Sequence, residues 1–130
     1  MLDASQIESL YDRYFKLATA GDVDGVVNLY AEDATIEDPI GSDLHRGHEA
    51  IRKFYEASAG SFVMRRTGPV RAAGLEAASP VVVLMGPPGP EQKVLDIIST
   101  MVFSEDGKIL AMRAYWNFGA LRPATDADRG

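Results

Sequence analysis

The sequence predicts an α+β domain in which helices come first and a meander of long strands follows. Apolar residues recur every three or four positions over roughly the first 60 residues, and the period then changes to alternation. With 130 residues, 46% of them hydrophobic and 25% charged, the chain has the length and composition of one globular domain spanning 1–130. This order of elements favours one curved sheet that wraps around the helices.

Three helices are expected in the first half of the chain. The first begins at a capping-box pattern, Ser5 with Glu8, and ends at Gly21, and its buried stripe consists of Ile7, Leu10, Tyr11, Tyr14, Leu17 and Ala18. Asp22 can cap a second, short helix whose apolar face carries Val23, Val26, Val27 and Tyr30. The third helix covers 47–59, with a buried face of Ile51, Phe54, Tyr55 and Ser58.

The strands follow from alternation and from turn residues. A short strand over 34–38 precedes Pro39, which forces Asp38 into extended geometry. Beyond Gly60, four longer strands are expected over 62–73, 75–85, 92–103 and 108–116, and the last two form a hairpin. Asn117 and Phe118 extend the final strand, and the polar tail over 123–130 is expected to be frayed.

Charge and composition exclude several classes of partner. The net charge of −6 lacks the Lys and Arg surplus that binding to nucleic acid or to an anionic membrane requires. The absence of cysteine excludes disulfides, thiol catalysis and thiolate metal sites. The first residues lack a secretory apolar core, and no apolar run approaches the roughly 18 residues of a membrane span, so a cytoplasmic protein is expected. His45 and His48 lie in a predicted loop and are interpreted as a turn, not as metal ligands.

Three polar residues fall on faces that should be apolar. Asp38 shares a strand face with Ala34 and Ile36, Ser99 interrupts the apolar stripe of 92–103, and Tyr14 lies on the buried stripe of the first helix. Each has an ordinary structural interpretation: Asp38 as a turn cap, and the two hydroxyls as core groups bonded to the backbone. Their joint direction into one apolar interior favours a functional pocket.

The chain resembles the bacterial Δ5-3-ketosteroid isomerases over nearly its whole length. The resemblance lies in the segments YDRYFKLATAGDVDGVVNLYAEDATIEDPIG, GHEAIRKFY, TGPVRA and GKILAMRAYW. The piece over 21–41 is shared more widely, by nuclear-transport-factor-like and polyketide-cyclase-like domains, so by itself it indicates fold more than activity. The resemblance implies a conical half-barrel with three N-terminal helices packed into a curved mixed sheet, a deep apolar cavity, and a homodimer formed through the sheet.

The resemblance also implies roles for single residues. Asp38 matches the base that moves a proton from C4 to C6 of a 3-oxo-Δ5-steroid, and Tyr14 matches the phenol that stabilises the dienolate oxygen. Tyr30 and Tyr55 match the tyrosines that hold this phenol. Ser99 stands where better-known relatives carry a protonated aspartic acid, so it becomes the second, weaker oxyanion donor. The remaining pocket residues are Phe54, Met101, Met112, Ala114 and Trp116, and no cofactor or metal is required.

Two other functions stay open from the sequence. The first is a non-catalytic domain of the same fold that binds a small apolar ligand or mediates dimerisation, with Asp38 in a structural role. The second is another enzyme of the superfamily, such as an epoxide hydrolase or a dehydratase. Such enzymes need further acid, base or water-positioning groups, which the predicted pocket lacks. The expected partner is therefore a small apolar ketone, with a steroid as the first candidate.

Overall fold

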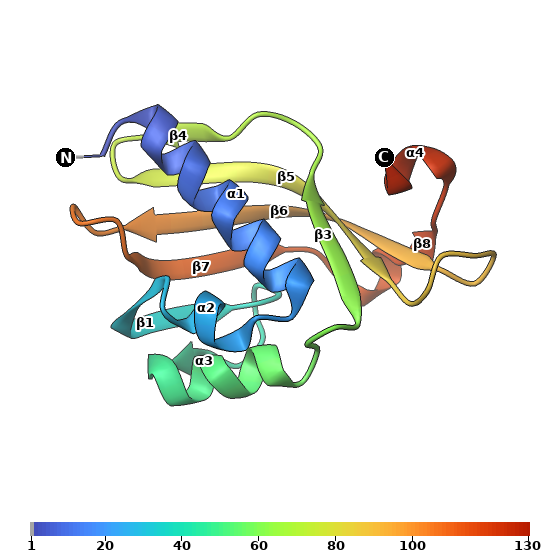
Figure 1. The fold of residues 1–130 in the computed structure, drawn as a ribbon, viewed down its shortest axis with the longest axis horizontal. Coiled ribbons are helices and arrows are strands. Elements are labelled where there is room, and N and C mark those ends of the chain that lie inside the picture. The colour runs from blue at the N-terminus through green and yellow to red at the C-terminus, as the bar shows by residue number, and fades with distance from the viewer. Residues whose placement is uncertain (1) are drawn as a thin grey trace.

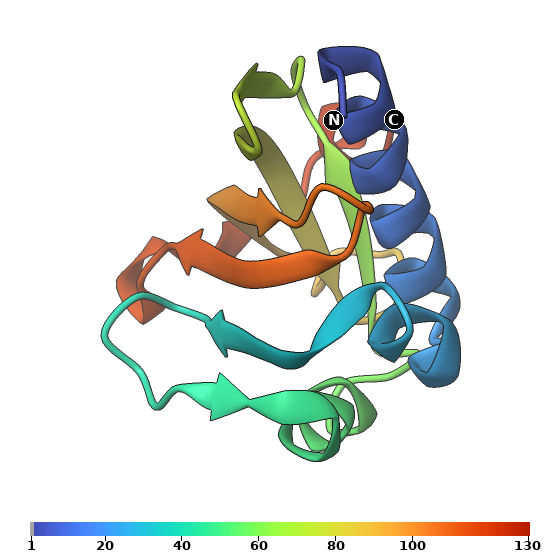
Figure 2. The same ribbon diagram turned by 90° about the vertical axis from the view of Figure 1, so that its left-hand side faces the viewer.

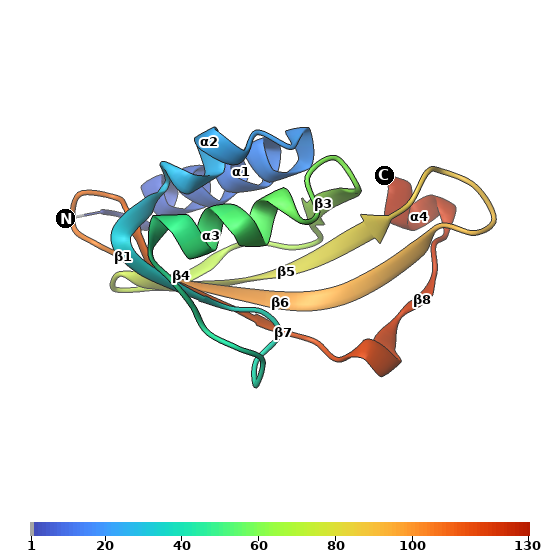
Figure 3. The ribbon, with the colours of Figure 1, turned by 90° about the horizontal axis from the view of Figure 1, so that it is seen from below.

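One face of a curved mixed sheet carries the three N-terminal helices (Figures 1 and 3), and the opposite face is covered at one end, where Ala124 of the C-terminal segment packs on Val82, Leu84 and Val94. The structure, a computed structural model, describes residues 2–130. The sheet has the order β2-β1-β7-β6-β5-β3, with β4 added beside β5 and β8 beside β6. The predicted α+β class, with helices packed into a curved sheet, is confirmed.

The first helix, α1 (Ala4–Ala20), begins two residues earlier than predicted, because its N-cap is Asp3 and not Ser5. The Asp3 carboxylate accepts the Gln6 N–H at 2.8 Å, and the Gln6 side chain accepts the Asp3 N–H at 2.8 Å. Asp3 and Gln6 have the same three-residue spacing as Ser5 and Glu8, so the capping box forms at the earlier pair and the predicted one is wrong. The helix ends as predicted at Gly21, whose φ of 72° is the left-handed conformation that favours glycine.

The next elements place Tyr30 in a strand. Asp22 caps α2 (Val23–Val27) through a 2.9 Å bond from the Gly25 N–H, as predicted. The chain then enters β1 (Tyr30–Glu37), which starts four residues before the predicted strand, so the assignment of Tyr30 to the second helix is wrong. Leu29 O accepts the Ile109 N–H at 2.9 Å, and this neighbouring strand draws the preceding residues out of helical geometry.

The segment predicted as a histidine-containing loop is ordered as regular structure. β2 (His45–Arg46) pairs antiparallel with β1, and His48 lies in the first turn of α3 (Gly47–Glu56). The helix is three residues shorter than predicted because 57–60 form turns, which close through the 3.2 Å bonds from Ala57 N–H and Ser58 N–H.

The long strands form the part of the sheet on which the helices pack. They are β3 (Phe62–Arg66), β4 (Arg71–Ala73), β5 (Glu76–Met85), β6 (Lys93–Phe103) and β7 (Ile109–Tyr115). The predicted single strand over 62–73 is wrong, because the chain breaks over 67–70, where Pro69 offers no N–H, and both halves pair with β5. β6 and β7 form the predicted antiparallel pair, and β7 also runs parallel to β1 (Figure 2).

The C-terminal segment, for which a frayed polar tail is predicted, contains short regular elements. Phe118 begins the short 3-10 helix η1 (Phe118–Ala120) and does not extend β7; β8 (Arg122–Pro123) and α4 (Asp126–Arg129) follow. Arg122 contacts Asp96 on β6 at 2.7 Å and Asp128 at 2.8 Å, and it lowers the pKa of both carboxyl groups. The polar composition that predicted fraying instead supplies the ion pairs that fasten the tail to the sheet.

Candidate active site

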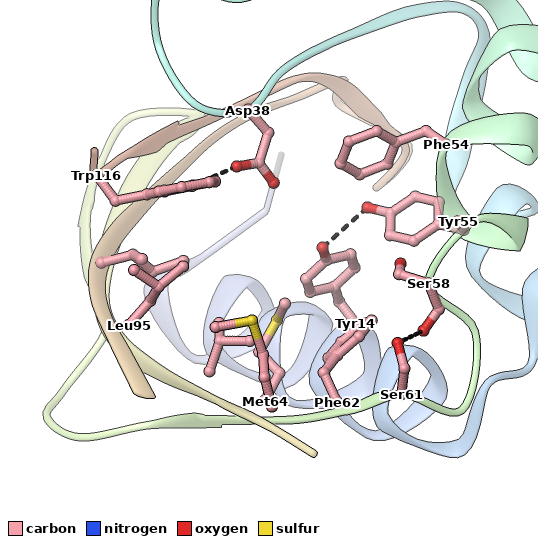
Figure 4. A pocket seen from close by; sticks show the side chains of 13 residues that line it. Tyr14, Asp38, Phe54, Tyr55, Ser58, Ser61, Phe62, Met64, Leu95 and Trp116 are labelled. Carbon is pink, nitrogen blue, oxygen red and sulfur yellow. Dashed lines mark hydrogen bonds between the residues drawn. The ribbon is translucent and has the colours of Figure 1, made fainter. Parts of the chain in front are cut away.

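An apolar cavity of about 200 Å³ lies between α1, α3 and the concave face of the sheet. Its walls come from both helices and from β3, β5 and β6, and the residues that line it are Tyr14, Asp38, Phe54, Tyr55, Ser58, Ser61, Phe62, Met64, Val83, Met85, Leu95, Ile97 and Trp116. Figure 4 shows Asp38 and Tyr14 on different walls, with the space between them open. A carboxylate and a phenol therefore face one apolar space, as the sequence predicted.

Three tyrosine hydroxyls form a buried chain that ends at the cavity. The Tyr14 and Tyr55 hydroxyls lie 2.8 Å apart, and the Tyr55 and Tyr30 hydroxyls 2.7 Å apart. Each of these side chains is at most 5% exposed, and burial raises the pKa of each well above its ordinary value. Tyr14 therefore stays protonated at neutral pH and can donate a hydrogen bond into the cavity while Tyr55 holds its oxygen.

Asp38 lies just beyond the end of β1, with one carboxylate oxygen already engaged. The Trp116 Nε1–H donates to Asp38 Oδ1 at 2.6 Å, and Figure 4 shows the second oxygen turned toward the cavity. Burial raises the pKa of Asp38, while the Trp116 hydrogen bond and the charge of His45 act in the opposite direction. A carboxylate that is partly desolvated is a stronger proton acceptor than one in water.

Ser99 lies on the inward face of β6, at 3% exposure, next along the stripe to Leu95 and Ile97, which line the cavity. Its Oγ is the one buried side-chain polar atom without a hydrogen-bond partner among residues 2–130. The Tyr11 hydroxyl holds the strand behind it, by donating to the backbone oxygens of Ser99 at 3.2 Å and of Ala77 at 3.1 Å. Ser99 itself lies outside the cavity lining, so a rotation or a bound ligand is needed to bring its hydroxyl into contact.

The other predicted pocket residues divide into two groups. Phe54, Tyr55 and Trp116 line the cavity, while Tyr30 lies behind Tyr55. Three lie in the core next to the cavity but outside its lining: Met101, Met112 and Ala114. Sequence reasoning missed the wall that is formed by Ser58, Ser61, Phe62, Met64, Val83, Met85, Leu95 and Ile97. The alternation of β5 and β6 contained the signal for the last four of these.

The two histidine side chains make separate contacts. The His45 ring packs on Phe54 with 4.9 Å between ring centroids, and His48 Nε2 contacts the backbone oxygen of Tyr30 at 2.8 Å. Over residues 2–130, no group of three or more His, Asp or Glu side chains is placed to hold a metal ion. None of the helices in this range is long and apolar enough to cross a membrane.

The fold and the cavity together define the class of protein: a domain in which helices and a curved sheet form a cone around an apolar pocket. The sequence matches the SnoaL-like domain family over residues 11–112, and the chain belongs to this family. It is 39% identical to a steroid Delta-isomerase from Nocardioides simplex over 113 residues, which cover 87% of this chain and 91% of that protein. The predicted resemblance to the steroid isomerases is thereby confirmed.

Two other similar proteins carry different names. The epoxide hydrolase LasB from Streptomyces lasalocidi is 30% identical over 125 residues, which cover 89% of this chain and 44% of that protein. The solved structure of SalBIII, an epoxide hydrolase/cyclase-like enzyme with a role in pyran ring formation in the polyether salinomycin, superposes with a TM-score of 0.86. At 25% identity, that match covers 95% of this chain and 100% of SalBIII.

Proposed function

We propose that the protein is a steroid Δ-isomerase that converts a 3-oxo-Δ5-steroid into its conjugated Δ4 isomer. One observation carries the proposal: a partly buried carboxylate, Asp38, and a neutral phenol, Tyr14, line the same apolar cavity, with the phenol held by a chain of further tyrosines. The similarity to the Nocardioides simplex steroid Delta-isomerase supports the same activity.

The proposed reaction moves one proton between two carbons of the substrate. Asp38 Oδ2 accepts the proton from C4, and the electrons of that C–H bond form the dienolate with its negative charge on the C3 oxygen. Asp38 then returns the proton to C6, and the double bond ends between C4 and C5. Because Trp116 holds Oδ1, the carboxylate can present Oδ2 to both carbons with a small movement.

The charge of the intermediate is stabilised at the opposite wall. Tyr14 donates to the developing oxyanion and receives the hydrogen bond of Tyr55, which in turn receives that of Tyr30. Ser99, with an unpartnered buried Oγ, is the proposed second donor. Tyr14, which is held in the cavity by Tyr55, needs little rearrangement when the charge forms, and this is the basis of its effect on rate, whereas the Ser99 hydroxyl must first be brought into contact.

The assay of choice follows 5-androstene-3,17-dione by the ultraviolet absorbance of its conjugated product. Turnover by the wild-type protein, with loss of turnover in Asp38→Asn, is the expected result. Steroid binding without turnover would identify a binding module and contradict the proposal.

Epoxide hydrolysis is the second candidate, because two of the similar proteins are named for it. Opening an epoxide with water requires an acid for the oxygen and a base for the water. Asp38 is the one carboxyl group among the described residues that line the cavity, and Tyr14, whose pKa is raised by burial, is a weak acid. The isomerase, which needs one base and neutral donors, fits this composition better. Incubation with an epoxide-bearing polyketide, read out as diol formation, tests the alternative.

We further propose a homodimer formed through the part of the opposite sheet face that the C-terminal segment leaves exposed. Ile98 and Tyr115 face each other across β6 and β7, and they are 43% and 44% exposed on that face. Large apolar groups in adjacent register positions on an uncovered sheet favour an interface. Sedimentation of the wild type against Ile98→Asp tests this, and a monomeric wild type would contradict it. The cytoplasmic location stays a prediction.

A further inference from the structure

The cavity adjoins a groove, and the proposed reaction uses none of the residues that line the groove alone. Four residues line both spaces: Asp38, Phe54, Ser58 and Trp116. The groove adds His45 from β2, Ala50 and Lys53 from α3, and Ala57 from the turn that follows α3. Cavity and groove therefore adjoin each other along the four shared side chains, with the cavity as the inner and the groove as the outer part.

The cavity is too small to hold the whole of a large ligand. Pockets for drug-sized ligands measure roughly 300–1,000 Å³, whereas the inner cavity measures about 200 Å³. Tyr14 lines only the inner part, and Asp38 lines both parts. A ligand with its ketone at Tyr14 and its reacting carbons beside Asp38 therefore extends its far end into the groove.

The groove is chemically different from the cavity at this far end. Two of its four additional residues are alanines, so His45 and Lys53 supply the only additional polar side chains among the described lining residues. Both carry nitrogen donors, and Lys53 is positively charged. A pair of nitrogen donors at the outer end of an apolar pocket favours an acceptor group on the ligand, although the net charge of −6 of the whole chain acts in the opposite direction.

Two carboxylates near the groove, Glu49 and Asp38, repel an anionic group on the ligand and so reduce the preference for it. Glu49 lies 3.5 Å from the Lys53 ammonium, with both side chains at least 74% exposed, and Asp38 stands at the inner end of the groove. The Glu49 contact is an exposed pair, which contributes little and leaves Lys53 free to turn to a ligand. Asp38 faces the reacting carbons, so the length of the ligand separates the negative charge of Asp38 from a carboxylate at the far end of the ligand.

We propose that the groove binds the end of the substrate remote from the ketone, and that Lys53 and His45 favour substrates in which this end carries a carboxylate. This inference rests on the proposed isomerase function and narrows its substrate class to amphipathic keto acids. Lys53 supplies the charge, while the ring of His45, held against Phe54, supplies a donor in a fixed place. The carboxylate takes no part in the reaction, so its effect falls on binding.

The test compares two Δ4-3-oxo products that differ only at the far end, one with a neutral ketone and one with a carboxylate side chain. Trp116 is the single tryptophan of the chain and lines both spaces, so its fluorescence reports binding without turnover. Lys53→Gln should raise the Kd of the acid by about 1.4- to five-fold, the range for an exposed charge pair. It should leave the Kd of the neutral ketone unchanged, and Lys53→Glu should weaken the acid further.

The matched control is Lys16→Gln, which removes the same charge from the exposed side of α1, away from the groove. It should leave both Kd values unchanged, and added salt should weaken only the binding of the acid. Equal Kd values for acid and ketone in the wild type, or equal effects of Lys53→Gln on both, would overturn the inference and leave the isomerase proposal intact. Absence of binding by both ligands would overturn the two together.

Discussion

Removal of single hydroxyls from the tyrosine chain should produce a graded loss of turnover. Tyr14→Phe removes the donor to the oxyanion, so its kcat should fall roughly 10²- to 10³-fold, the usual loss for one such donor. Tyr55→Phe removes the 2.8 Å hydrogen bond that polarises Tyr14 but leaves Tyr14 itself. A neutral hydrogen bond contributes about 0.5–1.5 kcal/mol, which corresponds to roughly a two- to ten-fold loss. Tyr30→Phe, one hydroxyl further away, should have the smallest effect.

The assay is the initial rate of ultraviolet absorbance change with 5-androstene-3,17-dione, measured for each variant across substrate concentrations. The losses should appear in kcat and less in KM, since the oxyanion forms only along the reaction. Circular dichroism of each variant checks that the buried substitution leaves the fold intact. A Tyr14→Phe enzyme within a few-fold of wild type, or a larger loss for Tyr30→Phe than for Tyr14→Phe, would refute the proposed order of donors.

Three further predictions concern the carboxylate and the second donor. Ser99→Ala should lower kcat by less than Tyr14→Phe does. Ser99→Asp should raise turnover at a pH where the new carboxyl group is protonated, and turnover should fall as the pH rises and this group ionises. Wild-type rates in both variants would show that Ser99 does not contact the oxyanion. Trp116→Phe deletes the hydrogen bond to the Asp38 carboxylate, so the acid limb of the kcat/KM profile should move to higher pH, and an unmoved limb would exclude this positioning. Because burial raises the pKa of Asp38 in the folded state, the folded protein loses stability as the pH rises above the ordinary value of 3.8, and the loss is complete above the folded-state pKa. Asp38→Asn should therefore raise Tm at pH 7 more than at pH 4, as scanning calorimetry would show.

The parts of the site that lie on single elements could be predicted from the sequence. The helical spacing of α1 placed Tyr14 on the buried face, and the alternation of β6 placed Ser99 inward, because both periods are local properties of the chain. The partner of Tyr14 was predicted through the family resemblance, not through the pattern. The Tyr14–Tyr55 bond joins residues 41 positions apart, and no local period specifies it.

Features that depend on the packing of distant elements could not be predicted. The Trp116–Asp38 bond spans 78 positions and requires the parallel pairing of β1 with β7. The order of the C-terminal tail depends on Arg122 and its partner Asp96 on β6, whereas the composition of the tail alone is typical of a frayed end. The spacing of Tyr30 continues the helical pattern of α2 and predicts a helix, but Tyr30 pairs with Ile109 of β7 and therefore lies in a strand.

The most direct test of the account is the pre-steady-state and steady-state turnover of Asp38→Asn beside the wild type, on the same β,γ-unsaturated ketone and with steroid binding measured in parallel. The amide keeps the shape of Asp38 and can still accept the Trp116 N–H, but it cannot take the proton from C4. Loss of nearly all isomerisation with steroid affinity retained is the predicted result. Turnover near the wild-type rate in Asp38→Asn would contradict the assignment of Asp38 as the base.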